Sequence, residues 1–351
     1  MKNCFLLLAI ILFFSCKKQT APIDTSSQAD NPFGIMVNKT DGIALGVHNE
    51  IGVAKTLSAK YVRSAIVLSQ WTGSNGYYDS ILANGVKPVT NLNWGNQNSG
   101  TVPFLTAAEL GSYTSVMEQV LTKYRPEVVV IENEETNLNY HSGSMQQYIA
   151  MLTAAIPVAH GKGLKITNGG ITGEAAYLVW QDYMTTGQTA KADDYAKRTF
   201  PPSVYASLPT LSVYLQTKMK MADTLLTAYK SMNLDYLNFH WYGDPRQPNN
   251  GPYNPAVDTT HINTQSLAEL IDYLKRKTGK TIITNEIGEK YYSPGYVTDI
   301  LQVTLDLKLP YVLWYSGDGE DRFDAKGLHS GNGALRPAGY AYQDFMRTHF
   351  K

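Results

Sequence analysis

Two glutamates follow apolar segments that are similar in sequence. Glu134 ends the segment VVVIENE at residues 128–134, and Glu286 ends the segment TIITNE at residues 281–286. Each apolar run is typical of a buried strand. Two carboxyl groups that face each other can cleave a glycosidic bond, because one protonates the leaving oxygen while the other attacks the anomeric carbon or activates water. We therefore predict that Glu134 and Glu286 form a catalytic pair, although a single glutamate after a strand is more often an exposed or capping residue.

The chain around these glutamates alternates between strand and helix patterns. Eight short apolar runs are predicted strands, at residues 34–37, 61–66, 88–92, 128–131, 164–167, 236–239, 281–284 and 311–314. Longer segments with helical spacing lie between several of them, at residues 107–124, 145–160, 211–232, 266–278 and 296–307. This α/β pattern favours a (β/α)8 TIM barrel in a single domain, closed by a helix at residues 337–348. A doubly wound open sheet is the alternative, and its dinucleotide-binding version is weakened because no Gly-x-Gly-x-x-Gly motif follows the first strand.

The strand count places the two glutamates after strands four and seven, on opposite sides of the barrel mouth. Barrel enzymes build their sites at the C-terminal ends of the strands. Long segments follow strands 5, 6 and 8, and the last two are irregular, at residues 243–263 and 318–332. We expect these long loops to shape the binding site.

The two glutamate motifs resemble those of the clan A retaining glycoside hydrolases, which include families 5 and 39. The resemblance implies that Glu134 is the acid/base, that Asn133 contacts the sugar 2-hydroxyl, and that Glu286 is the nucleophile. The sequence departs from the family pattern on both sides of Asn133-Glu134. Glu132 stands where an aromatic residue or glycine is usual, and Glu135 stands where proline is usual.

The resemblance extends along the chain from residue 33 to residue 350. Segment 61–63 (YVR) resembles a second-strand element whose arginine supports the nucleophile, and segment 238–242 (NFHWY) resembles the sixth-strand His-x-Tyr element. Trp314 resembles the aromatic floor of a sugar subsite. Segment 335–340 (LRPAGY) resembles the start of the closing helix.

Elementary electrostatics assigns roles to these residues. Arg63 would keep Glu286 ionised, and Tyr242 could donate a hydrogen bond to it. His240 would position the sugar or link the two carboxylates through a polar network. The alternatives are a structural ion pair for Arg63 and a core histidine for His240.

Aromatic and amide side chains cluster at the predicted strand ends. Trp71, Trp94, Trp241 and Trp314 all lie there, and indole rings stack on the apolar faces of sugars. Asn91 and Asn93 could bind sugar hydroxyls beside Trp94. Core packing for the tryptophans and turn formation for the asparagines remain alternatives.

Composition narrows the range of ligands. The 351 residues carry 30 Lys+Arg and 30 Asp+Glu, so the formal net charge is zero. This balance disfavours nucleic acid as a partner and fits an uncharged polysaccharide or oligosaccharide. The seven histidines form no His-x-x-x-His pair and no phosphate-binding loop is present, so we expect no metal and no cofactor. We expect a monomer.

The N-terminus reads as a targeting segment. Residues 5–14 are apolar, too short for the roughly 20 residues of a membrane span but suited to a signal peptide. The run ends at Cys16 in a segment that resembles a lipoprotein lipobox, with phenylalanine at the usual leucine position. We predict a lipoprotein signal peptide at residues 1–15, lipidation of Cys16, and a polar flexible tether at residues 16–31 before a barrel at residues 32–351. This predicts a bacterial cell-envelope protein that reaches the membrane through its N-terminal lipid only.

These patterns predict a retaining glycoside hydrolase that cleaves β-linked polysaccharide or oligosaccharide by double displacement. A non-catalytic glycan-binding lipoprotein on the same barrel is the first alternative, and a polysaccharide esterase is the second. The esterase is disfavoured because no Gly-x-Ser-x-Gly elbow is present. The sequence carries no code for the sugar, the linkage, or attack within chains as against chain ends.

Overall fold

The computed structural model describes residues 30–38, 47–243, 264–289, 293–317, 327–330 and 334–350. Residues 31–351 form one compact unit. The predicted signal peptide, Cys16 and nearly all of the tether lie outside the described residues. So do most of the two irregular loops predicted after strands 6 and 8.

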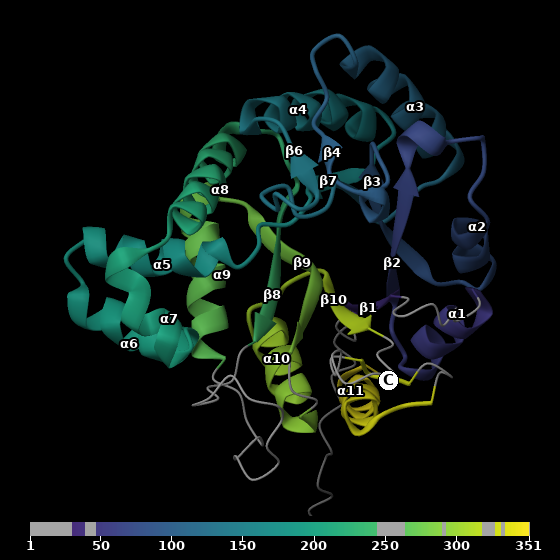
Figure 1. The fold of residues 1–351 in the computed structure, drawn as a ribbon. Coiled ribbons are helices and arrows are strands. Elements are labelled where there is room, and N and C mark those ends of the chain that lie inside the picture. The colour runs from purple at the N-terminus through teal and green to yellow at the C-terminus, as the bar shows by residue number, and fades with distance from the viewer. Residues whose placement is uncertain are drawn as a thin grey trace, which may run out of the picture. The chain divides into compact units, whose positions relative to one another are not determined.

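Eight parallel strands form the sheet, which confirms the predicted TIM barrel (Figure 1). They are β1 Phe33–Asn38, β2 Tyr61–Val67, β3 Lys87–Asn93, β5 Val128–Ile131, β7 Lys165–Asn168, β8 Tyr236–Gly243, β9 Thr281–Glu289 and β10 Val312–Gly317. Their order in the sheet is β7-β5-β3-β2-β1-β10-β9-β8. The outer strands β7 and β8 then meet, because Ile171 and Phe239 form a bridge and Asn168 bonds to the backbone of Asn238. A separate two-stranded sheet pairs β4 Val102–Pro103 with β6 His141–Ser142.

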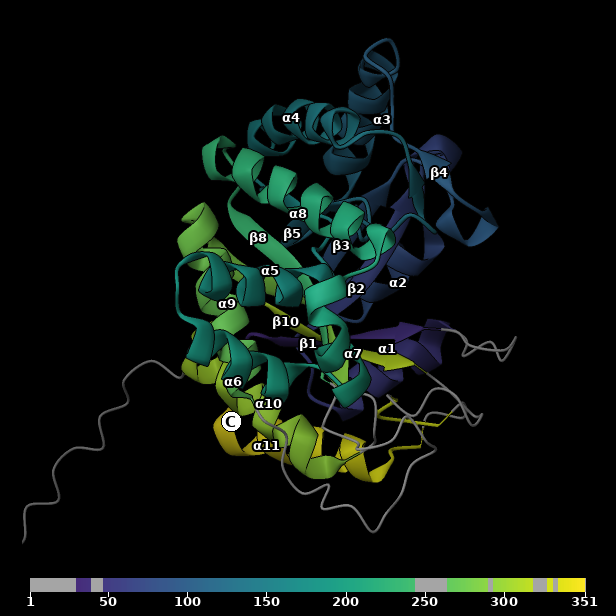
Figure 2. The same ribbon diagram turned by 60° about the vertical axis from the view of Figure 1, so that its left-hand side comes forward.

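Helices surround the strands on the outside (Figures 1 and 2). They are α1 Val47–Thr56, α2 Gly76–Ala83, α3 Leu110–Lys123, α4 Met145–Gly161, α5 Glu174–Thr185, α6 Thr189–Thr199, α7 Pro202–Ser207, α8 Val213–Ser231, α9 Gln265–Thr278, α10 Pro294–Asp306 and α11 Pro337–His349. Local sequence sets several of their ends. Ser144 and Gln147 form a capping box at the start of α4, and Gly279 ends α9 in the left-handed conformation that glycine favours.

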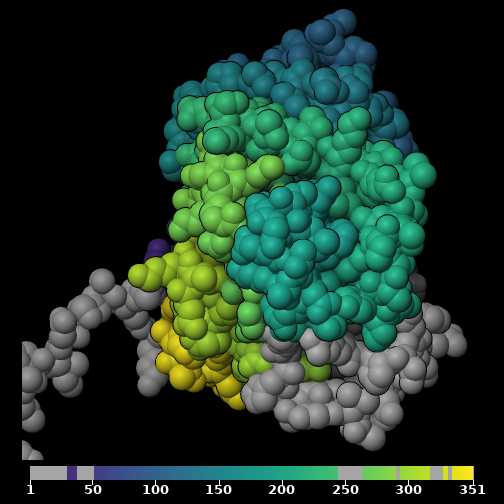
Figure 3. Space-filling view, turned by 90° about the vertical axis from the view of Figure 1, so that its left-hand side faces the viewer, coloured from purple at the N-terminus to yellow at the C-terminus, as the bar shows by residue number. Residues whose placement is uncertain are grey.

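The segment between β7 and β8 is helical, where we expected one helix and a long loop. Besides α8, it contains α5, α6 and α7, which form a continuous surface on one side of the molecule (Figure 3). Tyr177 and Phe200 pack there with ring centroids 4.4 Å apart, and the ring of Tyr195 lies 6.3 Å from that of Phe200. The aromatic residues of this segment therefore form a core between helices.

The interior of the barrel is divided into an apolar half and a polar half. A small apolar cluster fills the part nearer the N-terminal ends of the strands; it consists of Tyr61, Val89, Val128, Val130, Ile283 and Leu313. The much larger apolar cluster includes Val62 and Val129, which alternate with residues of the first set along β2 and β5. Two residues further along the same face of their strands, Arg63, Asn91 and Asn285 are polar and buried, so polar side chains fill the C-terminal half of the interior.

The closing helix lies where the sequence predicts it. The hydroxyl of Tyr342 in α11 donates to the carbonyl of Gly34 in β1 at 3.0 Å. Gly339 also packs closely, because a Cβ there would lie 2.0 Å from the carbonyl oxygen of Leu328. α11 therefore packs against the first strand of the barrel.

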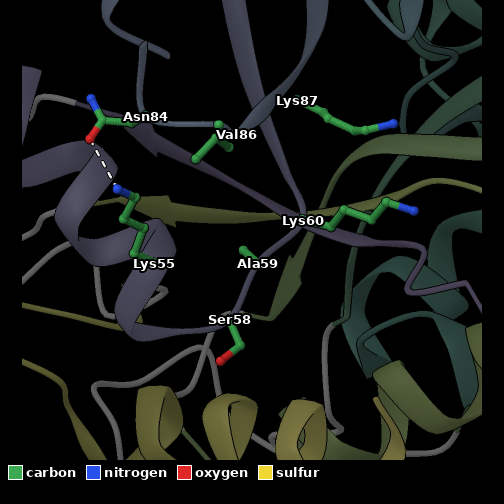
Figure 4. A pocket seen from close by; sticks show the side chains of 8 residues that line it. Lys55, Ser58, Ala59, Lys60, Asn84, Val86 and Lys87 are labelled. Carbon is green, nitrogen blue, oxygen red and sulfur yellow. Dashed lines mark hydrogen bonds between the residues drawn. The ribbon is translucent and has the colours of Figure 1, made fainter. Parts of the chain in front are cut away.

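A pocket of about 350 Å³ opens at the opposite end of the barrel from the two glutamates (Figure 4). Lys60 and Lys87, at the N-terminal ends of β2 and β3, line it together with Lys55. Lys55 donates to Asn84 at 3.0 Å, and Lys87 pairs with Glu127 at 2.7 Å. Lys55 and Lys87 are thus engaged by neighbouring side chains. Among the described residues, no helix is both long and apolar enough to cross a membrane.

Candidate active site

The two predicted catalytic glutamates converge at the C-terminal ends of the strands. One oxygen of Glu134, one oxygen of Glu286 and one ring nitrogen of His240 all lie within 4.8 Å of one another. Glu134 is partly exposed, with 14% of its side chain accessible, whereas Glu286 is buried. The prediction that strands four and seven bring two carboxyl groups together is therefore confirmed.

The backbone around Glu134 is unusual for residues with side chains. Glu132 has φ 63° and Glu134 has φ 49°, both in the left-handed region. Residues are held in this region only where the surrounding contacts compensate for the strain. Here the amide of Trp94 donates to the Glu132 carboxyl group at 2.7 Å, and Asn137 donates to Glu134 Oε2 at 2.7 Å.

A bulge in β9 turns Glu286 into the barrel. Val312 and Trp314 of β10 are two residues apart but pair with Thr284 and Ile287, which are three apart. The extra residue lets both Asn285 and Glu286 point inward, although they are adjacent in sequence.

Glu286 is held by two donors. Arg63 and Tyr242 each donate to one of its carboxylate oxygens. Burial alone would raise the pKa of Glu286, but the positive charges of His240 and Arg63 and the hydrogen bonds from Tyr242 and Arg63 lower it to about 2. Glu286 is therefore ionised at neutral pH, as we predicted from Arg63.

His240 lies between the two carboxyl groups. Its Nδ1 is 3.2 Å from Glu134 Oε1 and 3.7 Å from Glu286 Oε2, and its Nε2 is 2.8 Å from Asn285 Oδ1. Burial alone would lower the pKa of His240, but the negative charges of Glu286 and Glu134 outweigh it and raise that pKa above its ordinary value. His240 thus links the carboxylates, one of the two roles expected for it.

A belt of four buried asparagines crosses the barrel below these residues. Asn91, Asn285, Asn238 and Asn168 follow one another, linked by hydrogen bonds of 2.7–3.0 Å. Arg63 enters the belt at Asn91, to which its Nε donates at 3.0 Å. The sequence suggested a sugar contact or a turn for Asn91, and the belt was not predicted.

Asn133 lies beside this assembly. Its Oδ1 accepts from Arg63, and its backbone carbonyl accepts from His141 Nε2 at 2.8 Å. Asn133 is partly exposed, and its contact with the sugar 2-hydroxyl stays a prediction.

Two further carboxyl groups lie deep beneath the site. Burial raises the pKa of Glu132 to about 8, and the amide of Trp94 offsets this only in part. Glu135 accepts from Asn168 at 2.8 Å and from Tyr229 at 2.7 Å, yet burial still raises its pKa. No sequence pattern indicated that these two carboxyl groups would be buried.

The tryptophans differ from the prediction. Trp314 is 1% exposed and packs outside the barrel interior, in the apolar layer between the strands and the helices. Side chains alternate along β10, so its neighbours Leu313 and Tyr315 point into the barrel and Trp314 points away from it. The predicted sugar-stacking floor at Trp314 is therefore wrong. Trp241 and Trp94 are partly buried against the same layer, and Trp94 meets Tyr113 edge-on.

Three other residues lie near the barrel mouth, and the sequence indicates their positions to different degrees. Tyr315 packs edge-on against Tyr242 with centroids 5.9 Å apart, and Tyr140 lies close enough to Glu134 and Glu286 for their charges to help burial raise its pKa. Alternation along strand eight could have revealed Tyr315, whereas Tyr140 lies in a loop without a pattern. Asn93 is buried, and its Oδ1 has no hydrogen-bond partner among the described residues.

Glu134, His240 and Glu286 are also close enough to surround a cation. However, Arg63 and Tyr242 already occupy both oxygens of Glu286, and the guanidinium supplies the compensating positive charge. These contacts argue against a metal site formed by the three residues.

Comparisons with known proteins support the fold. No protein-family model matches the sequence, and no curated protein matches it. An endo-β-1,3-glucanase of family GH128 from Sorangium cellulosum is 15% identical, with a TM-score of 0.53 over 89% of this chain and 98% of that chain. A β-glucosidase from Pyrococcus furiosus is 11% identical, with a TM-score of 0.54 over 88% of this chain and 85% of that chain. An endo-β-1,4-glucanase from Xanthomonas axonopodis pv. citri, in triple-mutant form, is 10% identical, with a TM-score of 0.53 over 90% of this chain and 99% of that chain. At these identities the similarity shows a shared barrel fold.

Proposed function

We propose that the protein is a retaining glycoside hydrolase that cleaves β-linked polysaccharides or oligosaccharides. The observation that carries this proposal is the closeness of Glu134 and Glu286, whose nearest oxygens lie within 4.8 Å. Retaining enzymes separate their carboxyl groups by about 5–5.5 Å, whereas inverting enzymes leave about 6.5–9.5 Å for a water molecule. The short separation favours direct attack by a carboxylate.

The surroundings of each carboxyl group suit a double displacement. Glu286, ionised by Arg63 and Tyr242, attacks the anomeric carbon and forms a glycosyl ester while Glu134 protonates the departing oxygen. Glu134 then removes a proton from water, which attacks the same carbon and releases the sugar with its configuration retained. Arg63 remains paired with Glu286 throughout and limits the charge that develops there.

The substrate class is inferred from charge and from the similar structures. With a formal net charge of zero, the chain provides no general field for anionic ligands. The endo-β-1,3-glucanase and endo-β-1,4-glucanase with similar folds make β-glucans the first substrates to test.

Two variants test the assigned roles. Glu286→Gln should abolish turnover, and azide should rescue Glu134→Ala but not Glu286→Gln, because only an intact nucleophile forms the glycosyl intermediate that azide attacks. The exposed Glu118 offers a matched control, and Glu118→Gln should retain wild-type activity. The anomer released by wild-type enzyme, read by NMR, should be the β-form.

Other outcomes would point to the alternatives. Tight glycan binding without product release, unchanged in Glu286→Gln, would favour a non-catalytic binding protein. Release of acyl groups together with inhibition by a serine-reactive reagent would favour an esterase.

We also propose that the N-terminus anchors the barrel to a bacterial cell-envelope membrane through a lipid on Cys16. The apolar run at residues 5–14 and the lipobox-like segment before Cys16 support this. Mass spectrometry of the mature N-terminus tests it, and an unmodified peptide spanning residues 14–17 would contradict it.

A further inference from the structure

We propose that Asn285 is a positioning residue that holds the proton of His240 on Nε2, so that Nδ1 is the nitrogen that exchanges a proton with Glu134. The amide of Asn285 is oriented by two independent chains of hydrogen bonds, one through Asn91 and one through Asn238. The consequence for catalysis rests on the proposed function, whereas the position of the proton does not.

The first chain begins at Arg63, whose guanidinium nitrogens can only donate. Arg63 Nε lies 3.0 Å from Asn91 Oδ1, and Asn91 Nδ2 donates to the backbone carbonyl of Glu132 at 2.7 Å. Because a carbonyl can only accept, the amide of Asn91 is fixed at both ends. Its oxygen must therefore also accept the bond of 2.9 Å from Asn285, which turns Nδ2 of Asn285 toward Asn91.

The second chain begins at the backbone of Asn285 itself. This N–H donates to Asn238 Oδ1 at 2.9 Å, so Nδ2 of Asn238 is the group that lies 2.7 Å from Asn285 Oδ1. Both chains give the same result. The oxygen of Asn285 faces away from Asn91 and toward His240.

This orientation decides which nitrogen of His240 carries the proton. Nε2 lies 2.8 Å from Asn285 Oδ1, an atom that can only accept, so Nε2 must donate. A neutral imidazole has one N–H group, and Nδ1 is then an acceptor facing Glu134 Oε1 at 3.2 Å. The backbone at Gly170 holds the ring in place, because even a Cβ there would lie 2.4 Å from Nε2.

The orientation lets His240 serve Glu134 in both of its protonation states. When Glu134 carries the proton, its O–H donates to Nδ1 of neutral His240. When Glu134 is ionised, an imidazolium donates Nδ1–H to it. The opposite tautomer would donate to Glu134 permanently and favour its ionised form, which cannot act as the acid.

Other charged groups also face His240. Glu286 of β9 lies 3.7 Å from Nδ1, and the charges of Arg63 on β2 and of Glu135 after β5 are also close enough to interact with the ring. These groups set the pH at which the ring titrates. Glu286 faces Nδ1, so its charge favours the doubly protonated ring, whereas the acceptor within hydrogen-bond distance of Nε2 is Asn285 Oδ1.

The tautomer can be measured without any substrate. In protein labelled with ¹⁵N-histidine, at a pH above the titration of His240, NMR should show a protonated Nε2 and a bare Nδ1 for this residue. The signal is assigned by its loss in His240→Gln. A neutral His240 protonated on Nδ1 would overturn the proposal, whatever the activity of the protein.

Two variants of Asn285 then test the positioning role. Asn285→Ala removes the acceptor, so both tautomers of His240 should become visible. Asn285→Asp keeps an acceptor oxygen, so Nε2 should stay protonated while the added charge moves the titration of His240 to higher pH. Identical ¹⁵N signals in Asn285→Ala and in the wild type would also overturn the proposal, and Asn285→Asp still provides the test if the alanine variant does not fold.

Kinetics supply the link to catalysis. On unactivated oligosaccharides, which need the acid, Asn285→Ala should lose about 10²-fold in kcat, whereas aryl glycosides with good leaving groups should lose only a few-fold. Asn139→Ala, at an exposed position of the neighbouring loop, is the control and should behave as wild type on both substrates. Equal losses on the two substrates would assign Asn285 a purely structural role. If wild-type protein cleaves no glycoside, the proposed function fails while the NMR result still stands.

Discussion

At the scale of single residues, the site keeps chemically identical side chains in opposite protonation states. Glu286 has a pKa of about 2 because Arg63, Tyr242 and His240 outweigh its burial. Glu132 has a pKa of about 8 because burial is opposed mainly by one amide hydrogen bond. The partners of each carboxyl group, rather than its depth, therefore decide its charge at neutral pH.

The raised pKa of Glu132 predicts a pH dependence of stability. In the unfolded chain this group ionises near its ordinary value of 4.5, whereas in the folded protein it keeps its proton until about pH 8. Its contribution to the free energy of unfolding therefore falls as pH rises between these values, by roughly 1.4 kcal/mol per pH unit, and levels off above pH 8. Glu132→Gln should remove this dependence, so the variant should gain a few kcal/mol relative to wild type between pH 5 and pH 8.

Urea unfolding of both proteins at the two pH values measures this difference. Glu135 is also buried, but it is present in both proteins and its effect cancels. A difference between variant and wild type that is the same at pH 5 and pH 8 would mean that Glu132 is already ionised in the folded protein.

At the scale of elements, the turn after β7 determines how closely the backbone approaches the site. Gly170 has φ 127°, and a Cβ there would meet the ring of His240 at 2.4 Å. Gly187, between α5 and α6, also has a positive φ of 74°, but a Cβ at that position would meet no atom within 4 Å. The two glycines thus share backbone strain and differ in their contact with the site.

This pair allows a controlled prediction. Gly187→Ala should lose about 1 kcal/mol of stability, because alanine disfavours positive φ, and Gly170→Ala should lose more, because its Cβ would also collide with the ring of His240. Only Gly170→Ala should displace His240 and lower kcat, by at least about tenfold, since misplaced catalytic groups cost rate steeply. Thermal unfolding tests the predicted losses of stability, and kcat measured on the same preparations tests the predicted loss of activity. Equal activity of the two variants would contradict the placement of His240.

Sequence patterns predicted the elements better than their interior contacts. Apolar runs located the eight strands, and the position of Glu134 and Glu286 after two of them was sufficient to bring them together. The belt residue Asn285 was not recognised, because its partners Asn91 and Asn238 belong to distant strands and its inward direction depends on a bulge. Trp314 was misassigned for a related reason: the end of an apolar run does not show which face of a strand a residue occupies.

At the scale of the whole molecule, the last helix, α11, is tied to the first strand of the barrel, β1. The hydroxyl of Tyr342 reaches the carbonyl of Gly34, 308 positions earlier. Because this contact is at the N-terminal half of the first strand, it lies far along the strands from the carboxyl groups. We therefore expect it to serve stability alone.

Tyr342→Phe should reduce the free energy of unfolding by about 1 kcal/mol and leave kcat unchanged, because one buried hydrogen bond is lost without a change in shape. Tyr340 is 56% exposed on the same helix, and Tyr340→Phe should alter neither quantity. Urea denaturation and activity assays measure both, and a loss of kcat in Tyr342→Phe would show that closure of the barrel is coupled to the site.

The asparagine belt also affects how fast the protein is chemically modified during storage. Asn168 precedes Gly169, and an asparagine followed by glycine is the pair most prone to spontaneous deamidation, through attack of the glycine nitrogen on the side-chain amide. Here that amide donates to Glu135 and to the carbonyl of Asn238, while the Gly169 nitrogen donates to Tyr148 at 3.0 Å. Both reacting groups are restrained for as long as the barrel is closed. The fraction of Asn168 that is converted to aspartate during storage would therefore measure how often the centre of the barrel opens.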